Sequence, residues 1–395
     1  MGLPRGIGPE IVAAASDNDP TNVGTAAAVG ARTGYQLSWV ALLVGPLLAV
    51  VLLIAAQVGM VARGDLQSLT RERYGRAVAG VLLLSVLLVN LATIAADLMA
   101  GAAGLGQLAG VDFRWLVAPL GALLIWLMVA GRYRYLMAVL RYLMLGFCAF
   151  GVALFLVHPD WARVLHGTVV PVLTKRTAAA ALALLGTTLT SYVYIWETIE
   201  RGVEEAPGPA RARAGAVTGG LITAALLWCM LVVSAATLNG EAAATAGQAA
   251  AALKPVAGQG AADLYAAGLV TSALVALPVL MATTAHVVGA QFGWRRGLSE
   301  RAGSARGFYA VLAASVGLAL VLALAGASVI STLEAASVLG GLGTPIGLAV
   351  LVRLARDPRV MGTQPISRRL AAAGWAVTAA VAGLSVLVLI SAVLT

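Results

Sequence analysis

Hydrophobic positions run through this chain in long segments that are almost free of charge and are separated by short polar connections. A membrane-spanning helix needs about 20 apolar residues, and a window of that length finds eleven segments. They cover 8–31, 38–60, 78–108, 114–131, 136–157, 178–203, 212–237, 262–291, 308–328, 332–354 and 368–393. The pattern predicts an all-α polytopic membrane protein with eleven transmembrane helices.

Composition supports this class and excludes a soluble domain. Of the 395 residues, 60% are hydrophobic and 11% are charged, against about 25% charged residues in soluble domains. If the N-terminus is cytoplasmic, 20 of the 26 lysine and arginine residues fall on the inside. We therefore expect the N-terminus inside and the C-terminus outside a cell inner (plasma) membrane, with the net charge of +9 serving orientation in the lipid bilayer and no nucleic acid as a partner.

The cysteines and the connections carry no evident chemistry. Cys148 and Cys229 lie within apolar segments without a metal-ligand partner, so we interpret them as core residues. The opening residues lack the features of a signal peptide, and the first segment is expected to stay in the mature protein. The longest connections, 158–177 and 238–261, are both expected outside, the second as a mobile Ala/Gly-rich cap.

The first span contains the costly polar stretch Ser16-Asp17-Asn18-Asp19-Pro20-Thr21-Asn22. A proline after Asp and Asn favours an unwound helix, which is tolerated at membrane depth when it is buried in protein or lines a cavity. Asp19 and Asn22 would then offer hard oxygen ligands to a cation, with Asp17 as a third ligand or a vestibule carboxylate. The alternative is that the two aspartates pair with arginines or cap a helix.

The sixth span has a corresponding interruption in Gly186-Thr187-Thr188-Leu189-Thr190-Ser191, followed by Glu197 and Glu200 on one helical face. The first and sixth spans open two five-span halves of opposite topology. Matching interruptions in two such halves indicate a transporter site at their interface. Helix packing through small residues is the alternative explanation for the second run.

Other polar groups at membrane depth are few. Asp97 in span three could accept a proton or hold a buried arginine such as Arg201. His286 is expected to have a packing role facing a cavity rather than to bind metal. Span ten offers a flexible or cavity-lining stretch with Ser337, Thr344 and Pro345. The chain has no phosphate-binding loop and no His-Glu-x-x-His motif, which argues against an enzyme.

These residues resemble the Nramp family of divalent-metal transporters over almost the whole chain. Gly8-Pro9, the run Asp19-Pro20-Thr21-Asn22, Gly34-Tyr35 and Trp39 are similar to the first span of that family, with its Asp-Pro-Gly-Asn motif. Weaker similarity lies in Ala96-Asp97-Leu98 and in the segment 357–362. The resemblance implies a LeuT-type fold of two inverted five-helix repeats, 1–157 and 174–354, with broken first and sixth helices and an eleventh span at 368–393.

The resemblance also shows where this chain departs from the family. The family has Met-Pro-His-Asn in span six, and this chain has Thr190-Ser191-Tyr192-Val193. Thr190 thus replaces a soft thioether by a hard hydroxyl, which suits magnesium or manganese. Tyr192 stands where the family has a histidine tied to proton movement, and Ala100 stands where the family has an acidic residue. These two departures argue against proton coupling. The nearest resemblance is to the Nramp-related magnesium transporter branch.

We therefore expect a transporter that imports Mg²⁺ and Mn²⁺ by alternating access, with the ion as substrate and no cofactor. Asp19, Asn22 and Thr190 are the expected metal ligands, and Asp17 and Glu197 are further candidates. The alternatives are a proton-coupled Mn²⁺/Fe²⁺ transporter of ordinary Nramp type, a sodium-coupled carrier of a small organic solute and a non-transporting membrane scaffold.

Overall fold

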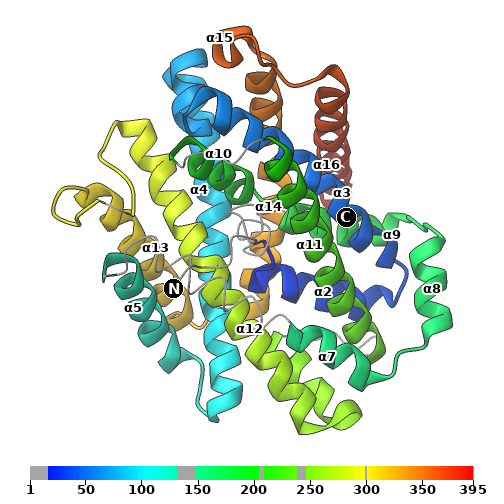
Figure 1. Cartoon of the computed structure of the whole chain (residues 1–395). Helices are drawn as coiled ribbons and strands as arrows, with labels where there is room; N and C mark the ends of the chain where they lie inside the picture. The colour runs from blue at the N-terminus through cyan, green and yellow to red at the C-terminus, as the bar shows by residue number, and fades with distance from the viewer. Residues whose placement is uncertain (1–16, 131–147, 204–208, 238–245, 299, 395) are drawn as a thin grey trace.

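Helices form all of the regular structure in the computed structural model, which describes residues 17–130, 148–203, 209–237, 246–298 and 300–394 (Figure 1). Within these residues, eight segments are long and apolar enough to cross a membrane, and Arg114–Val129 is a shorter apolar helix. These eight segments and the shorter helix match the predicted spans two to four and six to eleven. The start of span one and most of span five lie outside the described residues.

The first half of the chain holds α2 (Pro20–Thr33), α3 (Ser38–Ala62), α4 (Leu66–Ala109), α5 (Arg114–Ala130), α7 (Cys148–Val157) and α8 (Trp161–Val169). The second half holds α9 (Lys175–Thr188), α10 (Ser191–Val203), α11 (Pro209–Thr237), α12 (Ala246–Phe292), α13 (Arg306–Leu324) and α14 (Val329–Arg356). The short α15 (Pro358–Met361) and the last span α16 (Arg368–Leu394) follow.

Helices at corresponding positions of the two halves pack on each other. α3 packs along α11, α4 along α12 and α5 along α13, and α4 runs through the middle of the molecule in Figure 1. Within the segment Thr177–Gly202, which contains α10, 83% of an 18-residue apolar window is buried, whereas only 28% of such a window is buried within Arg368–Ile390. The broken sixth span is thus the centre of the bundle, and α16 presents most of its surface outward, as expected of a helix that faces lipid.

Both long connections contain helix. That the second forms a mobile cap stays a prediction. α12 begins at Ala246 and runs through the predicted loop without interruption. The segment is rich in alanine, the strongest helix former, so its composition favours helix over coil. In the other connection Asp160 caps α8, and its Oδ1 accepts hydrogen bonds from the backbone N–H groups of Ala162 and Arg163.

The third span begins earlier than the hydrophobic pattern predicts. Asp65 caps α4 by accepting a hydrogen bond from the Ser68 backbone N–H at 2.9 Å, and polar residues form the first two turns. Gly75 then kinks the helix with φ of 85°, a value that an L side chain rarely adopts. A hydropathy window finds only the apolar part after this kink.

Candidate functional site

The first half of the site is the start of α2, and its sequence explains its shape. Asp19 is the N-cap, its Oδ1 accepts a hydrogen bond from the Asn22 backbone N–H at 2.7 Å, and Pro20 occupies the first helical position. Aspartate at the cap and proline directly after it are both favoured there. Asp19 thus caps α2, which was part of the alternative interpretation and does not exclude a role as a ligand. The cap lies inside the protein because Asp17, Asp19 and Asn22 are at most 1% exposed.

The second half of the site is the break in the sixth span, which begins after Thr188 and ends before Ser191. The Thr188 hydroxyl donates to Asn22 Oδ1 at 3.0 Å, and the Thr190 hydroxyl donates to Asp17 Oδ1 at 3.4 Å. The Tyr192 hydroxyl donates to Asp19 Oδ2 at 3.1 Å. The two interruptions therefore meet, and four of the five predicted ligands (Asp17, Asp19, Asn22 and Thr190) lie in one connected group.

A third carboxylate joins this group from α4. Asp97 is fully buried, and its Oδ1 accepts hydrogen bonds from the backbone N–H of Thr21 at 2.8 Å and the Thr21 hydroxyl at 2.6 Å. The other oxygen, Oδ2, has no hydrogen-bond partner among the described residues, and neither has Asp17 Oδ2. The structure shows Asp97 in contact with Thr21, and Arg201 in an ion pair with Glu197. That Asp97 accepts a proton stays a prediction.

Glu197, the fifth predicted ligand, is placed differently. Its Oε1 lies 2.9 Å from the Arg201 Nε, and both side chains are fully buried. Five residues separate it from Tyr192, so it points to another side of α10 about 7 Å further along the helix. The structure thus joins Glu197 to Arg201. Its role as a ligand stays a prediction.

The electrostatic character of the site follows from this arrangement. Asp17, Asp19 and Asp97 are carboxylates removed from water, and no ion pair joins them to a basic residue within the described part of the chain. Buried negative charge without a partner is strongly unfavourable, so the group favours a cation or bound protons. No three His, Cys, Asp or Glu side chains in the described residues form a metal cluster, so hydroxyl and amide oxygens would have to share the coordination.

Several contacts of the site were not predicted. The Asn18 Nδ2 donates to the Thr223 hydroxyl of α11 at 3.2 Å, and the Ser272 hydroxyl of α12 donates to the Asn18 carbonyl. Thr21 and Thr188 also contact site residues without having been singled out. The only sequence signal for Thr223 and Ser272 is that hydroxyl side chains interrupt otherwise apolar spans.

A cavity of about 660 Å³ lies between α2, α9 and α14 and is called the α2–α14 cavity here. Thr25 and Ser337 line it and are joined by a 2.8 Å hydrogen bond one turn beyond Asn22. Arg32 and Glu334 line it further along α2 and form an exposed ion pair at 2.5 Å. The expectation that Ser337 lines a cavity is confirmed.

A second cavity of about 370 Å³, called the α4–α10 cavity, lies beyond the far end of α10. It is lined by Asp65, Glu72, Ile199, His286 and Arg296 among others. His286 packs edge-on against Trp196 and Phe308, with ring centroids 6.4 and 5.2 Å away. The expected packing role of His286, facing a cavity, is therefore confirmed.

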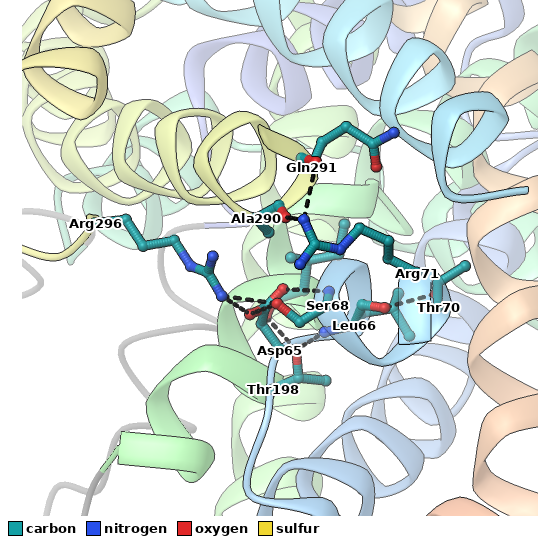
Figure 2. A network of polar contacts seen from close by, with 10 residues as sticks. Asp65, Leu66, Ser68, Thr70, Arg71, Thr198, Ala290, Gln291 and Arg296 are labelled. Carbon is teal, nitrogen blue, oxygen red and sulfur yellow. Dashed lines mark hydrogen bonds and ion pairs between the residues drawn. The ribbon is translucent and has the colours of Figure 1, made fainter. Parts of the chain in front are cut away.

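Figure 2 shows the polar network at the start of α4, of which Asp65, Ser68 and Arg296 line this cavity. Arg296 donates to Asp65 Oδ2 at 2.8 Å and to the Ser68 hydroxyl at 2.7 Å. Arg71 donates to the Ala290 and Gln291 carbonyls at 2.8 and 3.0 Å. The Leu66 backbone N–H donates to the Thr198 hydroxyl of α10 at 3.1 Å. The start of α4 is thus tied to the segment after α12 and to α10.

The amino-acid sequence is similar to a family of known membrane transporters over almost its whole length. The family model for natural resistance-associated macrophage protein-like proteins, Nramp, matches residues 10–391. The divalent metal cation transporter MntH of Mycobacterium tuberculosis is 27% identical, over 97% of this chain and 90% of the relative. The MntH of Deinococcus radiodurans is 29% identical over 69% of this chain and 67% of the relative.

Solved structures show the same fold at low sequence identity. The manganese transporter of Eremococcus coleocola, in complex with an aromatic bis-isothiourea substituted compound, superimposes with a TM-score of 0.71 at 19% identity, covering 96% of this chain and 84% of that chain. Mhp1, a nucleobase-cation-symport-1 family transporter, superimposes with a TM-score of 0.64 at 14% identity, covering 96% and 91%. Together with the all-helical architecture, these likenesses confirm the expected LeuT-type fold.

Proposed function

Because the chain belongs to the Nramp family of divalent-metal transporters, we propose that it imports Mg²⁺ and Mn²⁺ by alternating access, with Asp17, Asp19, Asn22 and Thr190 as ligands. The observation that carries the proposal is the meeting of the start of α2 with the break between α9 and α10 at a buried group of oxygen atoms. Divalent cations of this kind prefer oxygen ligands, and the carboxylates supply the negative charge that a cation offsets.

The choice of ion rests on Thr190. Thr190 lies in the break of the sixth span, and its hydroxyl donates a hydrogen bond to Asp17. A hydroxyl is a hard ligand, which favours Mg²⁺ or Mn²⁺ over softer transition metals. Magnesium also keeps several of its waters when it binds to proteins, so a site with few charged ligands suits it. The relatives with printed functions transport divalent metals or manganese, which agrees with the manganese part of the proposal.

We propose that transport proceeds without proton coupling, because Tyr192 and Ala100 stand where the resemblance implies proton-handling residues. A proton-coupled Mn²⁺/Fe²⁺ transporter is the second candidate, and one observation favours it. Asp97 keeps a buried carboxylate oxygen with no hydrogen-bond partner among the described residues, and such an oxygen is a suitable proton acceptor.

The topology belongs to the same proposal. We propose that residues 1–157 and 174–354 are inverted repeats, that 368–393 is the eleventh span, and that the N-terminus is cytoplasmic and the C-terminus outside. The packing of α3 on α11, α4 on α12 and α5 on α13 supports the two repeats. The arginine-rich connections support the orientation.

Uptake of Mg²⁺ and Mn²⁺ into proteoliposomes, with internal pH recorded, tests the proposal. Asp19→Ala removes both the charge and the helix cap, whereas Asp19→Asn keeps a good cap and removes only the charge. We expect both variants to lose uptake, by about 10- to 100-fold. Asp112→Asn, at an exposed aspartate, is the matched control and should behave as wild type.

The outcomes separate the hypotheses. Uptake that survives in Asp19→Asn but not in Asp19→Ala would reduce Asp19 to a structural cap and remove it from the ligand set. Acidification of the vesicle interior together with metal uptake would replace the uncoupled mechanism by the proton-coupled one. Transport of Mn²⁺ without Mg²⁺ would show that the ion preference inferred from Thr190 is wrong.

A further inference from the structure

A large groove lies at the end of the molecule where α15 is found, at the top of Figure 1. Its volume is about 1250 Å³, and it is lined by the end of α3, the start of α11, α15 and the start of α16. The candidate membrane spans Ser38–Ala62, Ala212–Thr237 and Arg368–Ile390 all begin or end there. The groove therefore opens at the level of one surface of the bilayer.

The charged residues among those described as lining the groove are all arginines. Arg63, Arg213, Arg359 and Arg369 line it, and no aspartate or glutamate does. All four are exposed, and none has an ion pair within the described part of the chain. Other arginines at this end do have partners, such as Arg73 with Asp357 at 2.5 Å. The groove thus concentrates guanidinium groups that remain available for an anion.

Arg63 adds a second, independent observation. It ends α3 in the left-handed region with φ of 48°, where glycine is strongly favoured and other residues are uncommon. Gly64 follows it directly, so a sequence with the glycine one position earlier would relieve the strain. A strained backbone that carries a charged side chain into a groove indicates a role for that side chain.

The other wall of the groove is apolar and belongs to a membrane span. Leu53, Gln57 and Met60 lie on one face of α3 at helical spacing and are only half-buried, and Leu370 of α16 lines the groove with them. A ligand that fills the groove therefore meets guanidinium groups at one end and hydrocarbon at the other.

We propose that this groove binds an anionic phospholipid, with the phosphate held by its four arginines (Arg63, Arg213, Arg359 and Arg369) and an acyl chain lying along Leu53 and Met60. Guanidinium groups bind phosphate oxygens through paired, charge-assisted hydrogen bonds. Basic pockets between membrane helices are known to hold such headgroups on the cytoplasmic side, and the groove lies on the arginine-rich side of this chain. The proposal is independent of which metal ion is transported.

The bound lipid would add to the contacts that already join α3, α11, α15 and α16 at this end of the molecule. A hydrogen bond from Gln57 Nε2 to the Gln364 carbonyl at 3.2 Å also lies here. Arg63 also lies two residues before Asp65, the acceptor of the Arg296 ion pair in Figure 2. A lipid on Arg63 and Arg369 would therefore brace the connection that closes the α4–α10 cavity.

Native mass spectrometry of the delipidated full-length protein in detergent tests the proposal, with phosphatidylglycerol and phosphatidylcholine as probes. Wild type should retain phosphatidylglycerol in preference to phosphatidylcholine. The double variant Arg213→Gln/Arg369→Gln should weaken phosphatidylglycerol binding by about 30-fold, since one arginine near an anionic lipid is worth about fivefold. Arg295→Gln/Arg301→Gln removes two exposed arginines of the same end outside the groove and should leave binding unchanged.

Three results would overturn the proposal. Equal retention of the two lipids by wild type would show that the groove does not select charge. Equal loss of binding in both double variants would show that net charge alone attracts the lipid. Displacement of phosphatidylglycerol by millimolar inorganic phosphate would identify a site for the free anion, in which the apolar wall has no part.

Discussion

Asp19 serves two purposes through its two carboxylate oxygens. Oδ1 caps α2 through the Asn22 backbone N–H, and Oδ2 accepts the Tyr192 hydroxyl of α10. One residue therefore caps the start of α2 and joins it to α10 in the second half of the protein. The aspartate, the proline after it and the tyrosine opposite each suit this geometry, so structure and proposed ion binding depend on the same side chain.

Thr190 allows the proposed ion preference to be tested at a single residue. Replacing it by methionine introduces the soft ligand that the resemblance implies for other family members, and a soft ligand favours softer cations. In Thr190→Met we expect Cd²⁺ to inhibit Mg²⁺ uptake on the order of tenfold more strongly than in wild type, which corresponds to about 1.4 kcal/mol. Competitive uptake in proteoliposomes measures this effect.

Thr190→Ser is the matched control, because it keeps the hydroxyl and removes only a methyl group. It should leave the inhibition by Cd²⁺ close to that of wild type. If methionine and serine gave the same inhibition, position 190 would not contact the ion, and the ligand set proposed for the second break would have to change.

Among the elements, α9 and α14 are the pair that packs most closely beside the break. A Cβ atom added to Gly186 would lie 2.5 Å from the Gly341 Cα and 2.6 Å from its backbone nitrogen. The Thr344 hydroxyl of α14 also donates to the Leu189 carbonyl in the break at 3.2 Å. The end of α9 is therefore held against the backbone of α14, which fixes the position of Thr188 and Thr190.

Gly186→Ala should destabilise the protein by about 1–3 kcal/mol, because two backbones in contact must separate to admit the methyl group. Thermal unfolding in detergent measures the change. Gly317→Ala is the control, since a Cβ atom there meets nothing within 4 Å, and it should unfold at the wild-type temperature or slightly above it. Equal unfolding temperatures for the two variants would contradict the close packing of α9 on α14.

The elements also show what the sequence can and cannot predict. Hydropathy identified the spans that the described residues contain, and the cost of polar groups identified the start of α2 and the break between α9 and α10, because each signal is local. The contact between Thr21 and Asp97 depends on how α4 turns toward α2, which no local pattern specifies. The start of α12 was missed because an Ala/Gly-rich segment carries no amphipathic signal although alanine favours helix.

At the scale of the whole molecule, the site lies between two separate cavities. The α2–α14 cavity extends along α2 away from Asn22, and the α4–α10 cavity lies at the far end of α10. The Thr25–Ser337 hydrogen bond closes the first approach, and the Asp65–Arg296 network closes the second (Figure 2). We expect these two contacts to limit access to the site from the two cavities.

The second closure can be tested through the Arg296 ion pair. Arg296→Gln removes the charge that holds Asp65 and Ser68, so we expect the α4–α10 cavity to open more often. A cysteine placed at Ile199, in a background without Cys148 and Cys229, should then react roughly fivefold faster with a water-soluble thiol reagent, the effect of about 1 kcal/mol. Labelling followed over time in liposomes measures this rate.

Arg295→Gln is the control for this measurement, because Arg295 is the exposed neighbour of Arg296. Its labelling rate should equal that of the parent. An unchanged rate in Arg296→Gln would mean that the network in Figure 2 only stabilises the fold and does not govern access to the cavity.

The hydrogen bonds already made by the site have a consequence for speed. Asn22 Oδ1 accepts from Thr188, and both oxygens of Asp19 are engaged within the protein. A cation that binds competes with these donors for the electron density of the same oxygens, and the donors keep the oxygens in place when it leaves. The affinity for the cation is therefore lower than carboxylates without hydrogen bonds would give, and the cation dissociates faster. Such a site suits rapid turnover rather than storage.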